Sequence, residues 1–145
     1  MSVETGQSLR MTRVIPADRR AVWAAWTDPE QMRKWSCPAP DGVESVESDF
    51  RVGGSFTLAM RVDGVPHTAF GTYREIDEPS RLVYTWDWKE EGQRMGETVV
   101  TVEFVERPGG TEVVLVHEGF PAPEARDGHD QGWLLCLDNF EALFG

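Results

Sequence analysis

The sequence predicts a single α+β domain in which a curved antiparallel sheet surrounds a long C-terminal helix. Three observations predict this fold: a short apolar run near the start, six later runs with a two-residue period, and a helical pattern over residues 124–144. A chain of 145 residues has the usual size of one domain with one core. No internal repeat or linker divides the sequence.

A strand and a short helix are predicted first. Leu9–Ile15 is a β-prone run that ends at Pro16, where the chain loses a backbone donor. Within Asp18–Thr27, apolar residues recur at helical spacing and predict a helix with one buried stripe, formed by Val22, Trp23 and Trp26.

A second short helix is predicted directly after the first. Asp28 can cap it, Pro29 suits its first position, and Gln31 completes a capping box of the D-x-x-Q form. The side chains expected to turn inward are Met32 and Trp35. Ser36–Asp41 contains two prolines and predicts a loop.

Residues 43–118 change to a period of two, which predicts an antiparallel meander. Gly53-Gly54 predicts a bend or bulge, and Asp63-Gly64 predicts a type I′ hairpin. Leu82, Tyr84, Trp86 and Trp88 give the clearest alternation in the chain. The six predicted strands are Val43–Phe50, Ser55–Val62, Val65–Ile76, Leu82–Trp88, Thr98–Glu106 and Thr111–Glu118.

The charge balance excludes several classes of partner. A formal net charge of -11 would repel nucleic-acid phosphates and anionic lipids, so we expect no nucleic acid as a partner. Residues 1–9 lack the apolar core of a secretory signal, and no stretch approaches the length of a membrane span. We therefore expect a cytoplasmic protein with no membrane insertion.

Cysteine and histidine spacing argues against a metal site. Cys37 and Cys136 lie far apart and are expected to be free thiols. His67, His117 and His129 show no H-E-x-x-H or Cys/His spacing, and neither a phosphate-binding loop nor a nucleophile elbow is present. We predict no metal and no cofactor.

Five segments together resemble the START-like SRPBCC superfamily, and within it the branch of activator of heat-shock protein 90 ATPase homologues. The resemblance covers residues 9–144. The segments are V-I-P-A-D-R-R-A-V-W-A-A-W-T-D-P-E at 14–30, F-R-V-G-G-S-F at 50–56, R-L-V-Y-T-W at 81–86, V-H-E-G-F-P at 116–121 and G-W-L-L-C-L at 132–137.

The resemblance implies a helix-grip (START/Bet v-like) fold. In that fold a seven-stranded sheet wraps the long helix, and two short helices lie between strands one and two. A cavity opens between sheet and helix, where members bind lipids, hormones, polyketides or other apolar molecules, and some members are enzymes. Members of this branch share no catalytic set that could be carried over to this chain.

A strongly curved sheet can contact a straight helix along only part of its length, so side chains or a guest molecule must fill the rest. We expect a mostly apolar pocket of roughly 300–1,000 Å³. The residues expected to bind the ligand are Trp35, Phe56, Met60, Phe70, Tyr84, Trp86, Val102, His117, Trp133 and Leu137.

Each candidate also has a plainer explanation. Tyr84 and Trp86 could form a stacking wall or an ordinary core. His117 could orient a ligand, act as an acid or base, or be a satisfied core histidine. Gly132 could mark a cavity mouth or a close contact with a strand. Cys37 is expected to be an ordinary cysteine.

Arg51 and Glu118 could meet inside the cavity, although charged residues at such positions more often form a solvated rim.

The sequence leaves three functions open. The first is binding of a small apolar molecule, and the second is an enzyme such as a cyclase or dehydratase that uses His117, Tyr84 and an acidic residue as acid and base in the same cavity. The third is a chaperone-associated interaction module, which the single domain disfavours. A homodimer also remains open.

Overall fold

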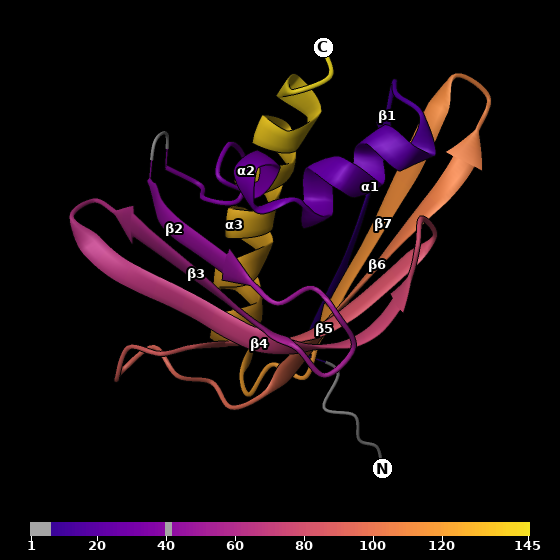
Figure 1. The fold of residues 1–145 in the computed structure, drawn as a ribbon. Coiled ribbons are helices and arrows are strands. Elements are labelled where there is room, and N and C mark those ends of the chain that lie inside the picture. Colours follow the sequence, from indigo (N-terminus) through magenta and orange to yellow (C-terminus); the bar gives the residue numbers. More distant parts are fainter. Residues whose placement is uncertain (1–6, 40–41) are drawn as a thin grey trace.

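A seven-stranded antiparallel sheet wraps around helix α3 in the computed structural model, which describes residues 7–39 and 42–145 (Figure 1). The predicted order of one strand, two helices, six strands and one helix is confirmed. The strands are β1 Ser8–Ile15, β2 Val43–Ser48, β3 Ser55–Val62, β4 Val65–Asp77, β5 Arg81–Trp88, β6 Thr98–Arg107 and β7 Gly110–Glu118. The helices are α1 Arg19–Thr27, α2 Pro29–Met32 and α3 Pro123–Ala142.

The sheet has the order β1-β7-β6-β5-β4-β3-β2, and every neighbouring pair is antiparallel. Strands β2 to β7 follow one another as a meander, while β1 pairs with β7 across the sheet. The sheet bends so that β2–β4 and β6–β7 form two arms, and all three helices lie on the concave side between them (Figure 1).

Local signals set the two short helices. Asp28 Oδ1 accepts a hydrogen bond from the Glu30 N–H at 3.0 Å, so the predicted cap forms. The reciprocal half of the capping box was predicted wrongly, because the Asp28 N–H donates to Ala24 O at 2.9 Å and so closes α1. The predicted loop Ser36–Asp41 includes residues 40 and 41, which lie outside the described residues.

The turn predictions are confirmed by backbone geometry. Asp63 and Gly64 have φ values of 52° and 79°, as a type I′ turn requires, and they join the paired residues Val62 and Val65. Gly53, at φ 88°, lies in the bend between β2 and β3. These turns place consecutive strands side by side in the meander.

Strand β5 departs from the simple alternation that the sequence predicts. Leu82, Tyr84 and Trp86 are buried as expected, but Thr85 and Asp87 on the opposite face are also only 5% exposed. Thr85 Oγ1 accepts from the Thr72 N–H, and Asp87 Oδ1 accepts from the N–H groups of Trp88 and Met95. These backbone N–H groups give the side chains of Thr85 and Asp87 hydrogen-bond partners, so both can be buried without leaving those oxygens unpaired.

Helix α3 docks through the face that its apolar spacing predicts. Trp133, Leu137 and Phe140 are buried, and fully burying a side chain of this kind contributes about 1.5–3 kcal/mol. Arg13 on β1 forms ion pairs with Asp138 at 2.9 Å and Glu141 at 3.1 Å on the outer side of the helix. These contacts fix the C-terminal half of α3 against the β1 edge of the sheet.

We predict that Gly71→Ala destabilises the fold, whereas Gly128→Ala does not. A Cβ on Gly71 would lie 1.9 Å from Thr85 O in the backbone of β5, so the strands would have to separate at a cost of about 3 kcal/mol. A Cβ on Gly128, in exposed helix, meets nothing within 4 Å, and alanine there should add up to about 1 kcal/mol of stability. Chemical denaturation of both variants measures the difference, and equal stabilities would contradict the close strand approach.

Candidate functional site: an apolar cavity under helix α3

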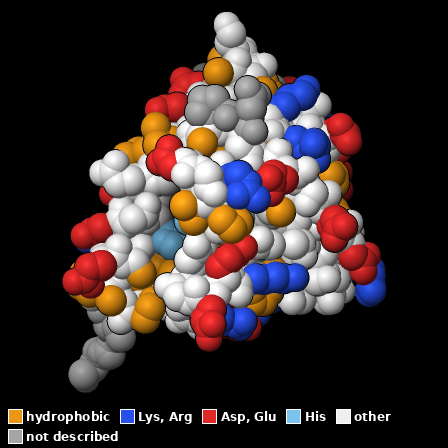
Figure 2. Space-filling view, turned by 90° about the vertical axis from the view of Figure 1, so that its left-hand side faces the viewer, with side chains coloured by type: hydrophobic (Ala, Val, Ile, Leu, Met, Phe, Trp, Pro, Cys, Tyr) orange, Lys and Arg blue, Asp and Glu red, His pale blue; other side chains and the backbone are white. Residues whose placement is uncertain are grey.

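A cavity of about 440 Å³ lies between the concave face of the sheet, the α1–α2 segment and α3. Its volume falls within the range typical of sites for small molecules. One face of the molecule is hollowed, with a histidine recessed among hydrophobic side chains (Figure 2). The structure therefore contains the kind of space that the curved sheet predicts.

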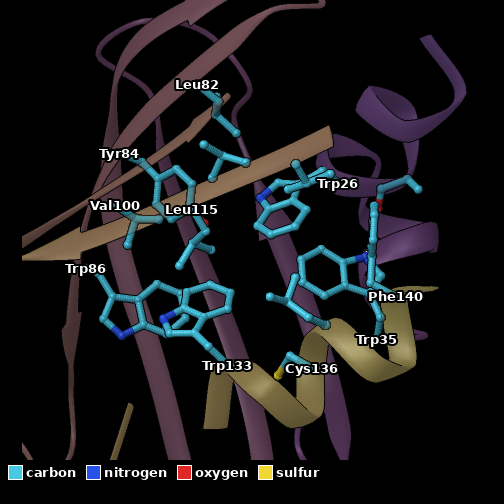
Figure 3. Packing of buried hydrophobic residues seen from close by; sticks show 14 of the residues in the cluster. Trp26, Trp35, Leu82, Tyr84, Trp86, Val100, Leu115, Trp133, Cys136 and Phe140 are labelled. Atoms are coloured by element: carbon cyan, nitrogen blue, oxygen red, sulfur yellow. The ribbon is translucent and has the colours of Figure 1, made fainter. Parts of the chain in front are cut away.

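Six of the ten expected ligand-binding residues line this cavity. Tyr84 and Trp86 project from β5 on one side, Trp35 lies on the opposite side, and Trp133 enters from α3 (Figure 3). The rings of Trp86 and Trp133 are 5.7 Å apart, and Trp133 stacks on Trp26 at 6.1 Å. The six residues are Trp35, Phe56, Met60, Tyr84, Trp86 and Trp133.

The other four expected residues lie elsewhere. Val102, Leu137 and His117 are at most 1% exposed and belong to the closed part of the core. Phe70 faces the opposite side of the sheet, where Lys89 Nζ and Arg94 Cζ each lie 5.7 Å from its ring. The prediction that Phe70 lines the cavity is therefore wrong. Ala69 and Gly71 take the inward positions of β4 and are buried there.

Several lining residues were not anticipated. Leu58 could have been found from the strand alternation, since it lies between Phe56 and Met60 on one face. His129 could have been found from helical spacing, because it precedes Trp133 by four residues. The further residues of this kind include Trp26, Met32, Phe50, Tyr73, Leu82, Gln93 and Met95.

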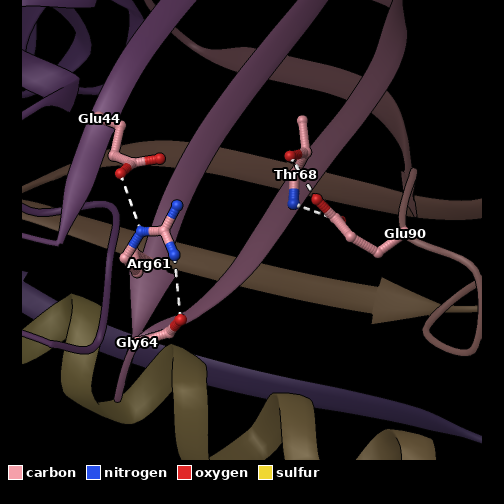
Figure 4. Close-up of polar contacts among 5 residues, drawn as sticks. All are labelled: Glu44, Arg61, Gly64, Thr68 and Glu90. Atoms are coloured by element: carbon pink, nitrogen blue, oxygen red, sulfur yellow. Dashed lines mark hydrogen bonds and ion pairs between the residues drawn. The ribbon is translucent and has the colours of Figure 1, made fainter.

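Polar contacts hold the rim of the cavity in place. The carboxylate of Glu90 accepts from both the N–H and the Oγ1 of Thr68 at 2.6 Å, which fastens the segment after β5 to β4 (Figure 4). His67 Nδ1 on β4 and Gln93 Oε1 in the segment after β5 are 2.9 Å apart. Arg61 donates to Glu44 and to Gly64 O, both at 3.0 Å, and so braces β2 and β3 (Figure 4).

His117 is a satisfied core histidine at the edge of the site. Trp133 Nε1–H can only donate, so His117 Nδ1 is its acceptor at 3.1 Å. The proton on His117 Nε2 then faces Thr98 Oγ1 at 2.8 Å, and the Thr98 hydroxyl donates to Trp86 O. Burial lowers the pKa of His117 well below its usual value, with a smaller contribution from His129, so the ring stays neutral.

His129 links α3 to the end of β5 at the rim. Its Nδ1–H donates to Ala125 O at 2.8 Å, and its Nε2 accepts from Trp88 Nε1 at 3.0 Å. Burial lowers the pKa of His129, an effect that the bond to Ala125 partly offsets. Both ring nitrogens are therefore engaged in a neutral imidazole.

The remaining candidate groups give no sign of catalytic activation. Burial raises the pKa values of the Tyr84 phenol and of the Cys37 and Cys136 thiols, so all three stay protonated near neutral pH. Both cysteines are free, as predicted. Among residues 7–39 and 42–145, no group of three or more His, Cys, Asp or Glu side chains could hold a metal ion.

The open questions about Gly132 and the charged pair are answered by geometry. A Cβ on Gly132 would meet only Pro38 Cγ, at 3.8 Å, and Gly132 lines the cavity, so the cavity-mouth interpretation is favoured over close packing. Arg51 and Glu118 are exposed, and Arg51 pairs with Asp49 at 2.9 Å rather than entering the cavity.

None of the helices in the described ranges is long and apolar enough to cross a bilayer.

Lowered histidine pKa values predict a loss of stability in mild acid. An unfolded chain takes up protons on His117 and His129 below about pH 6.5, whereas the folded chain does not until the pH falls to their lower folded values. Between about pH 6.5 and pH 8, the free energy of unfolding should therefore be steady. Below about pH 6.5, each group should lower that free energy by about 1.4 kcal/mol per pH unit.

His117→Gln should weaken the dependence of the free energy of unfolding on pH. Glutamine does not titrate in this pH range, and it can both donate and accept hydrogen bonds. Denaturant unfolding between pH 8 and pH 5 measures this dependence for the wild type and the variant. An unchanged slope in the variant would show that His117 does not carry the effect.

Comparisons with known proteins agree with this fold. A protein of Chromobacterium violaceum is 27% identical, with a TM-score of 0.81 over 95% of this chain and 96% of that one. One from Rhizobium leguminosarum is 26% identical, with a TM-score of 0.81 over 94% and 93%. The AHSA1-like protein of Aeromonas hydrophila is 25% identical, with a TM-score of 0.75 over 93% and 90%.

No curated protein matches the chain closely enough to supply an activity. The family model described as "Activator of Hsp90 ATPase homolog 1-like protein" matches residues 16–145, which include both short helices, β2 to β7 and the whole of α3. The chain therefore belongs to the family of Activator of Hsp90 ATPase homolog 1-like proteins.

Proposed function

We propose that the protein binds a small hydrophobic molecule in the cavity under α3. The observation that carries this proposal is a cavity of about 440 Å³ whose wall consists largely of aromatic, methionine and aliphatic side chains. Burying apolar surface there contributes about 25 cal/mol per Å², from which the costs of ordering the ligand are subtracted. Because the aromatic rings pack against one another, little of the site must be ordered on binding.

Binding is favoured over the two alternatives. A cyclase or dehydratase that uses His117, Tyr84 and an acidic residue is disfavoured, because His117 lies outside the cavity lining with both nitrogens engaged. Tyr84 lines the cavity, yet burial raises the pKa of its phenol, which makes it a weaker acid and leaves little phenolate to act as a base near neutral pH. The chaperone-associated alternative has only the family's name in its support.

We also propose a cytoplasmic location, which two buried free thiols support.

Native mass spectrometry and a thermal-shift screen of neutral apolar compounds test the proposal. A co-purified molecule, or a compound that stabilises the protein, is the expected result. At about 100 times its Kd, a ligand adds about 2.7 kcal/mol to the free energy of unfolding. Absence of any bound molecule and of any stabilisation across the screen would contradict it.

Two variants of α3 locate the binding. Gly132→Phe should abolish the ligand-dependent shift, because its ring enters the cavity mouth next to Pro38. Leu135→Phe adds the same ring on the same helix at a position that is 49% exposed and outside the lining, and it should leave the shift intact. Equal shifts in both variants would place the ligand elsewhere.

A further inference from the structure

Five tryptophans line the cavity, and four of their indole N–H groups already have partners within the protein. Trp35 donates to Ala25 O at 2.8 Å, and Trp26 forms a hydrogen bond with the Tyr84 side chain. Trp88 and Trp133 donate to His129 and His117. Among buried side-chain nitrogen and oxygen atoms of the described residues, Trp86 Nε1 stands alone without a partner.

This unpaired donor has a physical cost. A buried donor without an acceptor destabilises the fold relative to a paired one, and folded proteins leave few such groups. Trp86 is 7% exposed and packs among the rings of Phe56, Tyr84 and Trp133. Since these neighbours present rings to the indole, an occupant of the cavity that Trp86 itself lines is the natural source of an acceptor.

The lining also restricts the charge of that occupant. Among the described residues that line it there is no Lys or Arg, and the one carboxylate belongs to Glu124, an exposed residue in the first turn of α3. His67 and His129 line it as well; burial lowers the pKa of His129, and its Nε2 already accepts from Trp88. A ligand anion would lose its hydration without gaining a buried cation, which is strongly unfavourable.

We propose that Trp86 Nε1–H is the polar recognition group of the cavity and that it donates to a carbonyl or ether oxygen of a neutral, otherwise apolar ligand. This inference rests on the proposed function and narrows it to one ligand class. Because the nitrogen is buried, the oxygen reaches it from the cavity side with a small displacement of the indole or of a flexible neighbour such as Met60 or Met95.

A matched pair of probes tests the proposal. Fluorenone and fluorene have nearly the same shape, but only fluorenone carries a carbonyl oxygen. We expect the wild type to bind fluorenone roughly tenfold more tightly than fluorene, as one hydrogen bond to a buried donor supports. Fluorene-9-carboxylate, an anion, should bind more weakly than either neutral probe. Isothermal titration calorimetry measures the three affinities.

Trp86→Phe keeps an aromatic ring but removes the N–H, so its fluorenone-to-fluorene preference should fall to about one. The ratio is the readout, because changes in cavity size affect both probes alike. Trp23→Phe is the matched control: it makes the same exchange at a buried indole that does not line the cavity, and the preference should persist. If Trp86→Phe does not fold, the carbonyl stretch of fluorenone bound to the wild type should still lie at lower frequency than in hydrocarbon solvent.

The outcomes separate the inference from the proposed function. Equal affinities of the wild type for fluorenone and fluorene would overturn the role of Trp86 and leave hydrophobic binding intact. If Trp86→Phe still prefers fluorenone, the carbonyl oxygen of fluorenone accepts its hydrogen bond from a donor other than Trp86, and the inference is wrong. If neither probe binds, the inference fails, whereas the proposed function fails only if the wider screen of apolar compounds also gives no stabilisation.

Discussion

The attachment of α3 along one side of a bent sheet is the constraint on which the cavity depends. The helix backbone approaches β1 more closely than any other strand, and Arg13 reinforces this contact through Asp138 and Glu141. Farther along, the bond from Trp133 to His117 ties the helix to β7. Inward side chains of β3, β4 and β5 line the cavity, so α3 does not fill the concave side of the sheet there.

The polar groups around this gap are almost all satisfied by the protein itself. His117, Thr98 and Trp133 form one closed chain of hydrogen bonds, and His129 joins Trp88 to α3 in another. A wall with neutral, paired polar groups offers little driving force for proton transfer but a large apolar contact surface. This balance favours a binding site over a catalytic one, and it sets apart Trp86 Nε1, the one unpaired donor among the buried side-chain groups that the structure describes.

Sequence patterns predicted the fold well because turns, caps and periodicity act locally. The lining was predicted where alternation is strong, as in β3 and β5. Phe70 was misplaced because the inward face of β4 carries Ala69 and Gly71, and a Cβ on Gly71 would also meet the Phe56 ring at 2.8 Å, so hydrophobic size was misleading there. Gln93 and Met95 reach the cavity through a segment whose path depends on tertiary contacts of Glu90 and Asp87, which no local pattern reveals.

The indole N–H signals of the six tryptophans in ¹H–¹⁵N spectra test the central claim most directly. Five of these side chains line the cavity, and Trp23, which is buried but does not line it, serves as an internal control. Titration with a neutral apolar compound should shift the five cavity signals saturably and leave that of Trp23 in place. Unchanged signals from the five, or an equal response from Trp23, would contradict a ligand held between sheet and helix.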